Sequence, residues 1–347
     1  MNPSRRRFLL GATSSVALVA VGACGGSSGG GGTGGSGPTP SPTPPPSPTP
    51  SPTPSPTPTP TSATTRLVLW GDSRTQGIGD VSPGIFSDLL AALIPSVAVV
   101  NAGVSGQTAA EVVARQGGAP TRLTLSGGAI PTSGPVVVGS ATVNIFAFAL
   151  DPNAAGSFEG TLAGVRGTYA ADGAGRQTFT RATAGSVVPV AAGTPFLTSL
   201  GEEARDDAMF LCVGRNGIET ERAEDVVELT RLAVEHLSTA DRRHVVAGVM
   251  PDLTATIGSA QRAPYDRLNA LLRTTWGAAF LDLATPPTDA EMAAIGYAPS
   301  AADRSDSAAG VYPRGMFQDT IHLRAAGQRI WAARVRDHLR GRGYIAG

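Results

Sequence analysis

A serine, a histidine and an aspartate have the types and spacing needed for nucleophilic catalysis. Ser73 stands in a Gly-Asp-Ser at the end of the apolar run 67–71, and Asp319 lies three residues before His322. A serine hydroxyl is a weak nucleophile at neutral pH, so it needs a base within hydrogen-bonding reach and a third group that holds the base. The sequence therefore predicts Ser73 as nucleophile, His322 as base and Asp319 as the group that orients it.

Each of these residues also has an ordinary structural interpretation. Asp319 could cap a helix, His322 could pack inside the fold, and Asn216 could be a turn residue. Three further histidines fall within predicted helices or at the start of a strand, which makes them weaker candidates for the base: His236, His244 and His338. Chemistry is favoured only if the candidate groups meet at one place in the fold.

Alternating strand and helix signals predict a sheet edge at which the candidate groups could meet. Apolar runs predict strands at 66–70, 97–100, 208–213, 244–249 and 279–283. Amphipathic segments predict helices at 85–94, 108–116, 221–237, 264–276 and 325–339. This alternation is typical of a parallel sheet covered on both faces, whose strands all end along one edge. Ser73, Gly103 and Asn216 each follow the end of a predicted strand, so we expect them to lie at that edge.

Four short stretches, taken in order, resemble the four sequence blocks of the SGNH hydrolases, also called the GDSL esterase/lipase family. They are Gly71-Asp72-Ser73, Asn101-Ala102-Gly103, Gly214-Arg215-Asn216 and Asp319-Thr320-Ile321-His322. The resemblance covers about 66–116 and 201–341. It implies a three-layer α/β/α domain with a parallel, flavodoxin-like sheet, and ester hydrolysis through an acyl-enzyme.

The resemblance also implies which groups would bind the oxyanion of the reaction. These would be the backbone N–H groups of Ser73 and Gly103 and the side-chain amide of Asn216. The chain departs from the family pattern at two positions. Arg74 stands where the family name has leucine, and Gly217 follows Asn216 where many members carry an acidic residue. Both departures leave the substrate side of the site open.

The N-terminal segment 1–24 has the features of an export signal. Arg5, Arg6 and Arg7 precede an apolar run from Leu9 to Val21, which is too short to span a bilayer comfortably as a permanent helix. The paired arginines resemble a twin-arginine signal, and the sequence that ends in Cys24 resembles a lipobox. We therefore expect lipid attachment at Cys24 and a location outside the cytoplasm, on a cell membrane or outer membrane. A plain secretory signal with a coincidental cysteine is the alternative.

Residues 25–65 are rich in Gly and Ser and then in repeated Pro-Thr and Pro-Ser pairs. Such a composition cannot bury enough apolar surface to fold, and its proline portion favours an extended chain. The sequence predicts a linker that holds the following domain away from a membrane.

The character of the chain changes again over 117–199. Helical periodicity disappears, and short strands between turn residues are expected at 123–125, 136–138, 143–148, 177–180 and 187–190. This pattern predicts a small all-β domain inserted into a hydrolase domain of 66–116 and 200–347. It could be a carbohydrate-binding module or a structural or oligomer-forming elaboration. Because the helix at 108–116 must run away from the strand ends, we expect the insert to lie far from Ser73 and the loop 284–318 to be the better cover for the site.

Charge and cysteine content indicate which ligands and cofactors the sequence does not favour. Lys+Arg and Asp+Glu are balanced at 27 each, so no basic surface points to nucleic acid. Neither a Cys-x-x-Cys nor a His-x-x-x-His is present, and no metal or cofactor is implied. Cys212 lies in an apolar run and is expected to be a small buried side chain rather than a nucleophile.

Together these features predict an exported, lipid-tethered serine esterase. The leading substrate class is O-acyl groups, above all O-acetyl groups, on a polysaccharide outside the cytoplasm. A lipase or simple-ester esterase is one alternative, and a non-catalytic surface-binding lipoprotein is another. The sequence leaves the oligomeric state open.

Overall fold

A computed structural model describes residues 64–79, 84–146, 148, 151, 154–239 and 241–346. The predicted export signal, with Cys24, and the predicted linker up to residue 63 lie outside the described residues. Within the ranges just given, no helix is long and apolar enough to cross a membrane.

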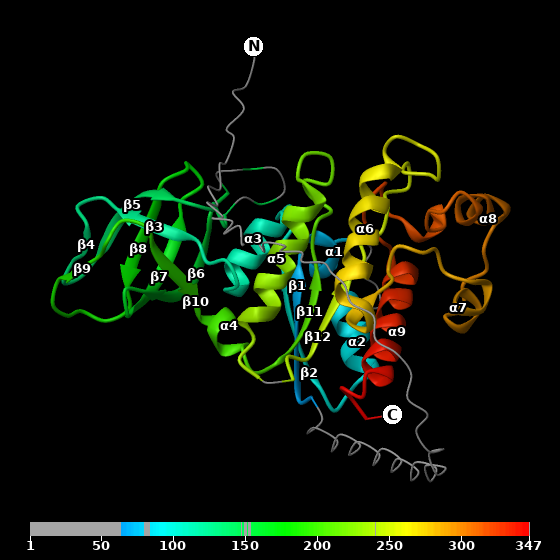
Figure 1. Ribbon diagram of the computed structural model, residues 1–347, viewed down its shortest axis with the longest axis horizontal. Coiled ribbons are helices and arrows are strands. Elements are labelled where there is room, and N and C mark those ends of the chain that lie inside the picture. The colour runs from blue at the N-terminus through cyan, green and yellow to red at the C-terminus, as the bar shows by residue number, and fades with distance from the viewer. Residues whose placement is uncertain are drawn as a thin grey trace, which may run out of the picture. The chain divides into compact units, whose positions relative to one another are not determined.

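A parallel five-stranded sheet forms the centre of the larger domain (Figure 1). The strand order is β13-β12-β11-β1-β2, and every pair is parallel. The strands are β1 (Arg66–Gly71), β2 (Ala98–Gly103), β11 (Ala208–Cys212), β12 (His244–Ala247) and β13 (Phe280–Leu281). All five correspond to predicted strands, and we refer to the edge where they end as the carboxyl edge.

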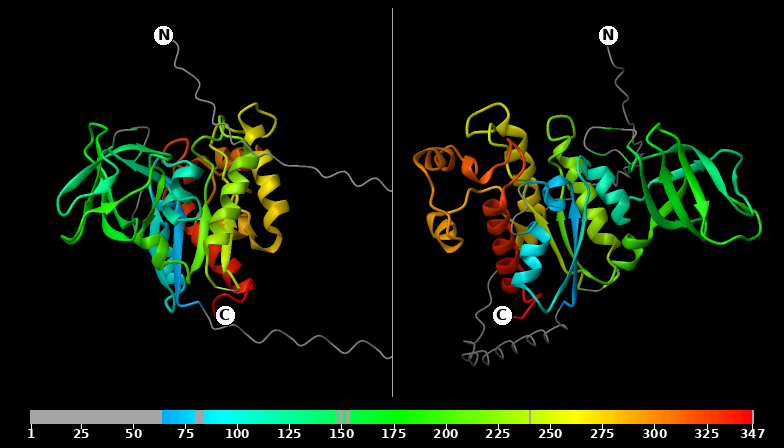
Figure 2. Two further views of the ribbon diagram at one scale, coloured as in Figure 1. Left: turned by 60° about the vertical axis from the view of Figure 1, so that its left-hand side comes forward. Right: turned by 180° about the vertical axis from the view of Figure 1, so that it is seen from behind.

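Helices cover both faces of this sheet, as Figures 1 and 2 show from three directions. One face carries α2 (Phe86–Leu93) and α9 (Ala325–Gly341), and the other carries α3 (Ala109–Gln116), α5 (Ala223–His236) and α6 (Arg262–Trp276). Side chains of β1 alternate between the two layers, since Leu67 and Leu69 pack toward α2 and α9, whereas Val68 and Trp70 pack toward α3, α5 and α6. The predicted three-layer α/β/α fold is confirmed.

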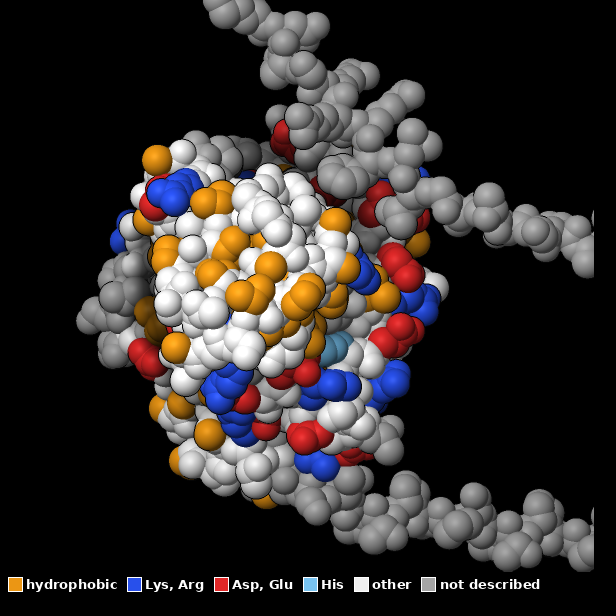
Figure 3. Space-filling model, turned by 90° about the vertical axis from the view of Figure 1, so that its left-hand side faces the viewer, with side chains coloured by type: hydrophobic (Ala, Val, Ile, Leu, Met, Phe, Trp, Pro, Cys, Tyr) orange, Lys and Arg blue, Asp and Glu red, His pale blue; other side chains and the backbone are white. Residues whose placement is uncertain are grey.

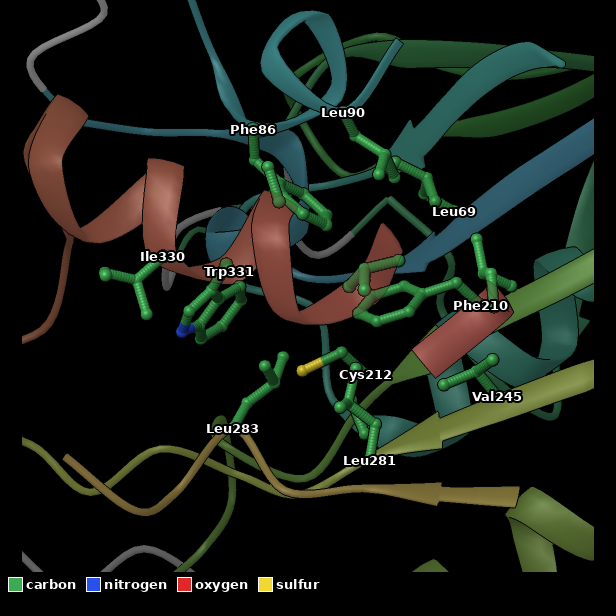
Figure 4. Packing of buried hydrophobic residues seen from close by; sticks show 14 of the residues in the cluster. Leu69, Phe86, Leu90, Phe210, Cys212, Val245, Leu281, Leu283, Ile330 and Trp331 are labelled. Carbon is green, nitrogen blue, oxygen red and sulfur yellow. The ribbon is translucent and has the colours of Figure 1, made fainter. Parts of the chain in front are cut away.

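Cys212 belongs to the layer with α2 and α9. Figure 4 shows it among the apolar side chains of that layer, Trp331 and Leu283 included. It is 4% exposed, and burial raises the pKa of its thiol to about 12. The interpretation of Cys212 as a buried apolar side chain is confirmed.

The segment 284–318, expected to cover the site as a loop, contains two helices and a short 3-10 turn. They are α7 (Asp289–Ala294), α8 (Ala301–Ala308) and η2 (Arg314–Met316). An ion pair between Arg334 and Glu291 holds α7 against α9, with Nε 2.7 Å from the carboxylate. Ile257 donates a backbone hydrogen bond to Ala309 just beyond α8. A covering role for this segment stays a prediction.

The chain between α3 and α4 (Ser199–Glu203) forms a separate all-β domain, which we call the β-insert. Six strands close a barrel in the order β10-β3-β5-β8-β7-β6, and a two-stranded sheet pairs β4 with β9. The strands are β3 (Arg122–Leu125), β4 (Ala129–Ile130), β5 (Pro135–Ala141), β6 (Gly156–Leu162), β7 (Val165–Ala171), β8 (Gln177–Arg181), β9 (Val188–Pro189) and β10 (Thr194–Thr198). Uncharged and hydrophobic side chains cover most of its outer end, with charged side chains at the margins (Figure 3).

The β-insert differs from the sequence prediction in three respects, and the first is that neither β4 nor β10 was predicted. The segment expected as a strand at 143–148 forms no strand over its residues 143–146, where Ile145 and Phe146 both turn inward and are 0% exposed in the barrel core. The hairpin of β6 and β7 was not predicted at all. Glycines interrupt the strand pattern of this hairpin. A Cβ on Gly160 would lie 2.4 Å from a ring atom of Phe196, so the barrel's aromatic core requires glycine there.

Candidate active site

Ser73 is positioned by a tight connection between β1 and the short helix α1 (Ser73–Gln76). The Asp72 side chain caps this helix by accepting a hydrogen bond from Arg74 N at 2.9 Å. Gly71 allows the close fit, because a Cβ there would lie 2.1 Å from Thr75 Oγ1. Ser73 is therefore held at the carboxyl edge of the sheet, where it was expected.

The three residues predicted to form a catalytic unit are brought together, although Ser73 and His322 are 249 positions apart. His322 Nε2 lies 2.9 Å from Ser73 Oγ, and His322 Nδ1 lies 2.7 Å from Asp319 Oδ2. The Asp319 carboxylate can only accept a hydrogen bond, so the hydrogen lies on Nδ1 and Nε2 presents its lone pair to the serine hydroxyl. This is the arrangement in which histidine can take the proton of Ser73. Their catalytic roles stay a prediction.

Asp319 is itself held by its own loop. Its Oδ1 accepts hydrogen bonds from Ile321 N at 2.6 Å and His322 N at 2.7 Å. Burial raises the pKa of Asp319, but the hydrogen bonds from the His322 side chain and from these two backbone groups outweigh it, so the pKa lies below its usual value. Asp319 therefore stays ionised at neutral pH and can stabilise a protonated His322.

Arg74 clamps the loop that carries His322. Its side chain is 2% exposed, and its guanidinium donates to Ile321 O at 3.2 Å, to Met250 O at 2.5 Å and to Asp252 Oδ1 at 2.7 Å. The Ile321 and Met250 acceptors lie 247 and 176 positions away along the chain. The departure from leucine at this position thus has a structural explanation, because Arg74 joins the loops that follow β1 and β12 to the histidine loop.

Asp252 extends this network to the loop after β11. It accepts two hydrogen bonds from Arg215, at 2.7 Å from Nε and 2.5 Å from Nη2. A paired guanidinium and carboxylate of this kind fixes both direction and distance. Because Arg215 directly precedes Asn216, the network also restrains the chain that carries the predicted oxyanion donor.

The Asn216 side chain makes a hydrogen bond that crosses the end of β1. Its Nδ2 donates to Gln107 O at 2.9 Å. Gln107 follows β2 and Asn216 follows β11, and β1 lies between these two strands in the sheet. A carboxamide nitrogen carries two hydrogens, so the bond to Gln107 leaves one for a substrate oxygen.

Gly103 does not fit its expected role as an oxyanion donor. Its backbone N–H donates to Asn101 Oδ1 at 2.9 Å and is therefore occupied. A Cβ on Gly103 would lie 2.2 Å from Gln76 N, so glycine is needed there for packing against α1. Gly106, which sequence reasoning missed, is a better candidate: it has a φ of 81°, and its N–H has no hydrogen-bond partner within the described part of the chain.

The other histidines lie elsewhere. His236 Nε2 is 3.3 Å from Glu202 near the end of α5, His244 Nδ1 contacts Arg242 O, and His338 is in α9. Burial lowers the pKa of all three. No group of three or more His, Cys, Asp or Glu side chains that could hold a metal ion occurs among the described residues.

Comparison with known proteins finds no matching family model and no matching curated protein. Among solved structures, the chain is similar to a member of the lipolytic protein G-D-S-L family from Veillonella parvula, at 14% identity and a TM-score of 0.41, over 79% of this chain and 97% of that one. It is also similar to Axe2, an acetylxylan esterase from Geobacillus stearothermophilus, at 12% identity and a TM-score of 0.42, over 80% and 94% of the two chains.

Proposed function

We propose that the protein is a serine hydrolase that cleaves carboxylic esters through an acyl-enzyme. The observation that carries this proposal is the continuous hydrogen-bonded path from Ser73 Oγ through both ring nitrogens of His322 to Asp319. The contact between Asp319 and Nδ1 favours the tautomer in which Nδ1 bears the hydrogen, which leaves Nε2 as the base for Ser73.

The reaction follows from this geometry in two halves. His322 takes the proton of Ser73 as Oγ attacks the ester carbonyl carbon, and the C=O electrons move onto the oxygen. The tetrahedral intermediate collapses with cleavage of the C–O bond, and His322 gives its proton to the departing alcohol. Water then attacks the acyl-Ser73 carbonyl with His322 again as base, which releases the carboxylic acid and regenerates the serine.

The developing negative oxygen needs donors at the carboxyl edge. We assign them to the backbone N–H of Ser73, the backbone N–H of Gly106 and the second Nδ2 hydrogen of Asn216. Such donors stabilise the transition state more than the ground state, because the oxygen carries a full charge only after attack.

O-acetyl groups on a polysaccharide are the substrate class that we propose. A short acyl group with a polymeric alcohol suits a domain tethered by a long linker and joined to a β-insert whose outer end is largely uncharged. The test is hydrolysis of acetylated polysaccharides beside p-nitrophenyl esters of increasing acyl length, each with Ser73→Ala as control. We expect acetyl esters to be preferred. A preference for long acyl chains would instead indicate a lipase, and hydrolysis of none by the wild type would favour a non-catalytic binding protein.

Export and lipid attachment at Cys24 are also proposed, on the sequence features alone. Replacement Cys24→Ser should move the protein from the membrane fraction to the soluble exported fraction while its activity on a soluble ester is unchanged. Membrane partition that is the same in both proteins would contradict attachment at Cys24.

A further inference from the structure

Gln107 lies where the β-insert meets the carboxyl edge of the sheet. It follows β2 in the loop before α3 and is 1% exposed. Both ends of its side-chain amide are used: Nε2 donates to Ile145 O at 2.7 Å, and Oε1 accepts from Arg115 Nε at 2.6 Å. Its main-chain oxygen accepts the hydrogen bond from Asn216. One buried residue thus contacts the barrel, α3 and the proposed oxyanion donor.

The orientation of the Gln107 amide is determined by its partners. Arginine is only a donor, so the Gln107 oxygen must face Arg115 and the NH₂ group must face Ile145 O. Arg115 is fixed in turn, because Nη2 donates to Ala102 O at 3.0 Å and the guanidinium lies 5.6 Å from the Trp70 ring centroid and 5.7 Å from that of Phe158. The Gln107 side chain therefore has one satisfied orientation.

The contact on the side of the β-insert is equally well fixed. Ile145 is 0% exposed, and the Phe146 ring beside it stacks on Phe158 at 5.5 Å. Asn144 Oδ1 accepts hydrogen bonds from Phe146 N at 3.2 Å and from Gln177 Nε2 at 2.9 Å. The segment 144–146 is thus anchored in the barrel core and reaches from there to the loop after β2. One segment of the β-insert therefore contacts the loop after β2, although both ends of the insert were expected to be remote from Ser73.

We propose that Gln107 is a positioning residue through which the β-insert orients the Asn216 amide. The inference rests on the proposed function, because Asn216 acts as a donor only in that reaction. If the Gln107 side chain loses its partners, its main-chain oxygen shifts and no longer holds one Nδ2 hydrogen of Asn216. The second hydrogen is then misdirected. The loss falls on kcat rather than KM, since the oxyanion forms only on the way to the transition state.

Gln107→Met is the first test, because methionine has a similar size and lacks both hydrogen-bonding groups. We expect kcat on a small soluble ester to fall about 10- to 100-fold, less than the loss of an entire oxyanion donor, with KM within about twofold. This outcome would extend the catalytic apparatus to the β-insert for every ester substrate and not only for polymers.

Gln116→Met is a matched control. Gln116 is 2% exposed, and its amide is likewise used at both ends, donating to Ala233 O at 3.1 Å and accepting from Gly118 N at 3.0 Å. It stands at the other end of α3 and faces α5. Its variant should lose thermal stability to a similar extent while kcat is unchanged, which separates positioning from packing.

A second variant, Gln107→Glu, keeps an acceptor for Arg115 and replaces the donor to Ile145 O by a carboxylate oxygen. It should also lower kcat, and it provides the test if the methionine variant does not fold. The double variant of Gln107→Met with Asn216→Ala should be no slower than Asn216→Ala alone, because both act through one donor.

Three outcomes would overturn the inference. Wild-type kcat in both Gln107 variants, or rate losses of Gln107→Met and Asn216→Ala that multiply in the double variant, would show that Gln107 does not act through Asn216. If Ser73→Ala is inactive in the same assays, the proposed function survives such a result. Retained hydrolysis by Ser73→Ala would overturn both the proposed function and this inference.

Discussion

The sheet domain and the β-insert bury aromatic and aliphatic cores of similar character, yet they stand in different relations to the proposed chemistry. At the carboxyl edge of the sheet, Ser73 and Asn216 are held by hydrogen bonds between loops that are remote in sequence. In the barrel, the chain is held by aromatic packing, with Tyr169 set edge-on to Phe196 at 5.2 Å. Substitutions at the carboxyl edge should therefore change the rate, whereas those inside the barrel should change stability first.

Outside Ser73, His322 and Asp319, the substitution Asn216→Ala should cause the largest change in rate. We expect kcat to fall about 100- to 1000-fold with little change in thermal stability, because one oxyanion donor is lost and the side chain lies at the edge. Steady-state kinetics on a small ester would measure this. A loss confined to KM would indicate that Asn216 only binds substrate.

Arg74→Met should lower both rate and stability. It removes the hydrogen bond to Ile321 O in the loop that carries His322, and it breaks the buried ion pair with Asp252. Removal of the guanidinium leaves Asp252 with one arginine partner in place of two, and leaves Ile321 O and Met250 O without this donor. We expect a loss of about 3 kcal/mol in the free energy of unfolding, with a lower kcat. Chemical denaturation and kinetics measure the two effects.

Arg273→Met is the control for that substitution. Arg273 pairs with Asp282 at 2.7 Å on the surface, where its side chain is 58% exposed. Exposed pairs contribute under about 1 kcal/mol. Equal destabilisation by both substitutions would contradict the clamp assigned to Arg74.

Gly160→Ala tests the barrel side of the comparison. The added methyl group would lie 2.3 Å from Leu197 O and 2.4 Å from the Phe196 ring, so overpacking should cost about 1–3 kcal/mol. The kcat of the folded fraction should be nearly unchanged. At Gly139 in β5 the nearest atom to an added Cβ is 3.4 Å away, so Gly139→Ala should have a much smaller effect. A large fall in kcat with normal stability in Gly160→Ala would remove the distinction between the two regions.

Replacement of Glu221 should have the smallest effect of these substitutions, and the effect should be visible only in the pH dependence of stability. Burial raises its pKa to about 7, with further contributions from Glu111 and Asp225. The folded state therefore binds the proton more tightly than the unfolded state. The stability contributed by the protonated carboxyl is fully present below the unfolded pKa near 4.5 and is lost as pH rises through about 7.

Glu221→Gln removes this titration. Denaturation at pH 5 and pH 8 should show that the variant gains stability relative to wild type at the higher pH. An unchanged difference between the two proteins at both pH values would contradict the raised pKa.

The sheet domain was more predictable from the sequence than the β-insert. Strand and helix periodicities located the sheet and placed Ser73 and Asn216 at its carboxyl edge, because parallel topology leaves one edge for the strand ends. The Asp319 and His322 spacing was informative because one loop brings them together. The sequence marks Arg74 only as a departure from the family pattern, because the acceptors of its hydrogen bonds lie in distant loops. Gly103 was misassigned because sequence alone cannot distinguish a glycine needed for packing from one that supplies a free N–H.

Inside the β-insert, periodicity gave the class of structure and little more. The hairpin of β6 and β7 was not predicted because Gly160 and Gly167 interrupt the apolar alternation of its strands. Glycine stands at these positions because aromatic rings of neighbouring strands occupy the space of a side chain. The run that includes Ile145 and Phe146 has the apolar composition of a strand. Two consecutive side chains of a regular strand would point to opposite faces, whereas these two are buried in the same core. Gln107 carried no signal, because its importance comes from partners on three different segments.

In the proposed mechanism, Ser73 is a nucleophile that is activated by His322. Treatment with a fluorophosphonate, which forms a covalent adduct with an activated serine, tests it directly, with Ser73→Ala and His322→Ala as comparison proteins. We predict that the wild type is labelled at Ser73, that Ser73→Ala is not labelled, and that His322→Ala is labelled at least about 1000-fold more slowly. Labelling of Ser73→Ala at the wild-type rate, or of His322→Ala as fast as wild type, would contradict the proposed mechanism.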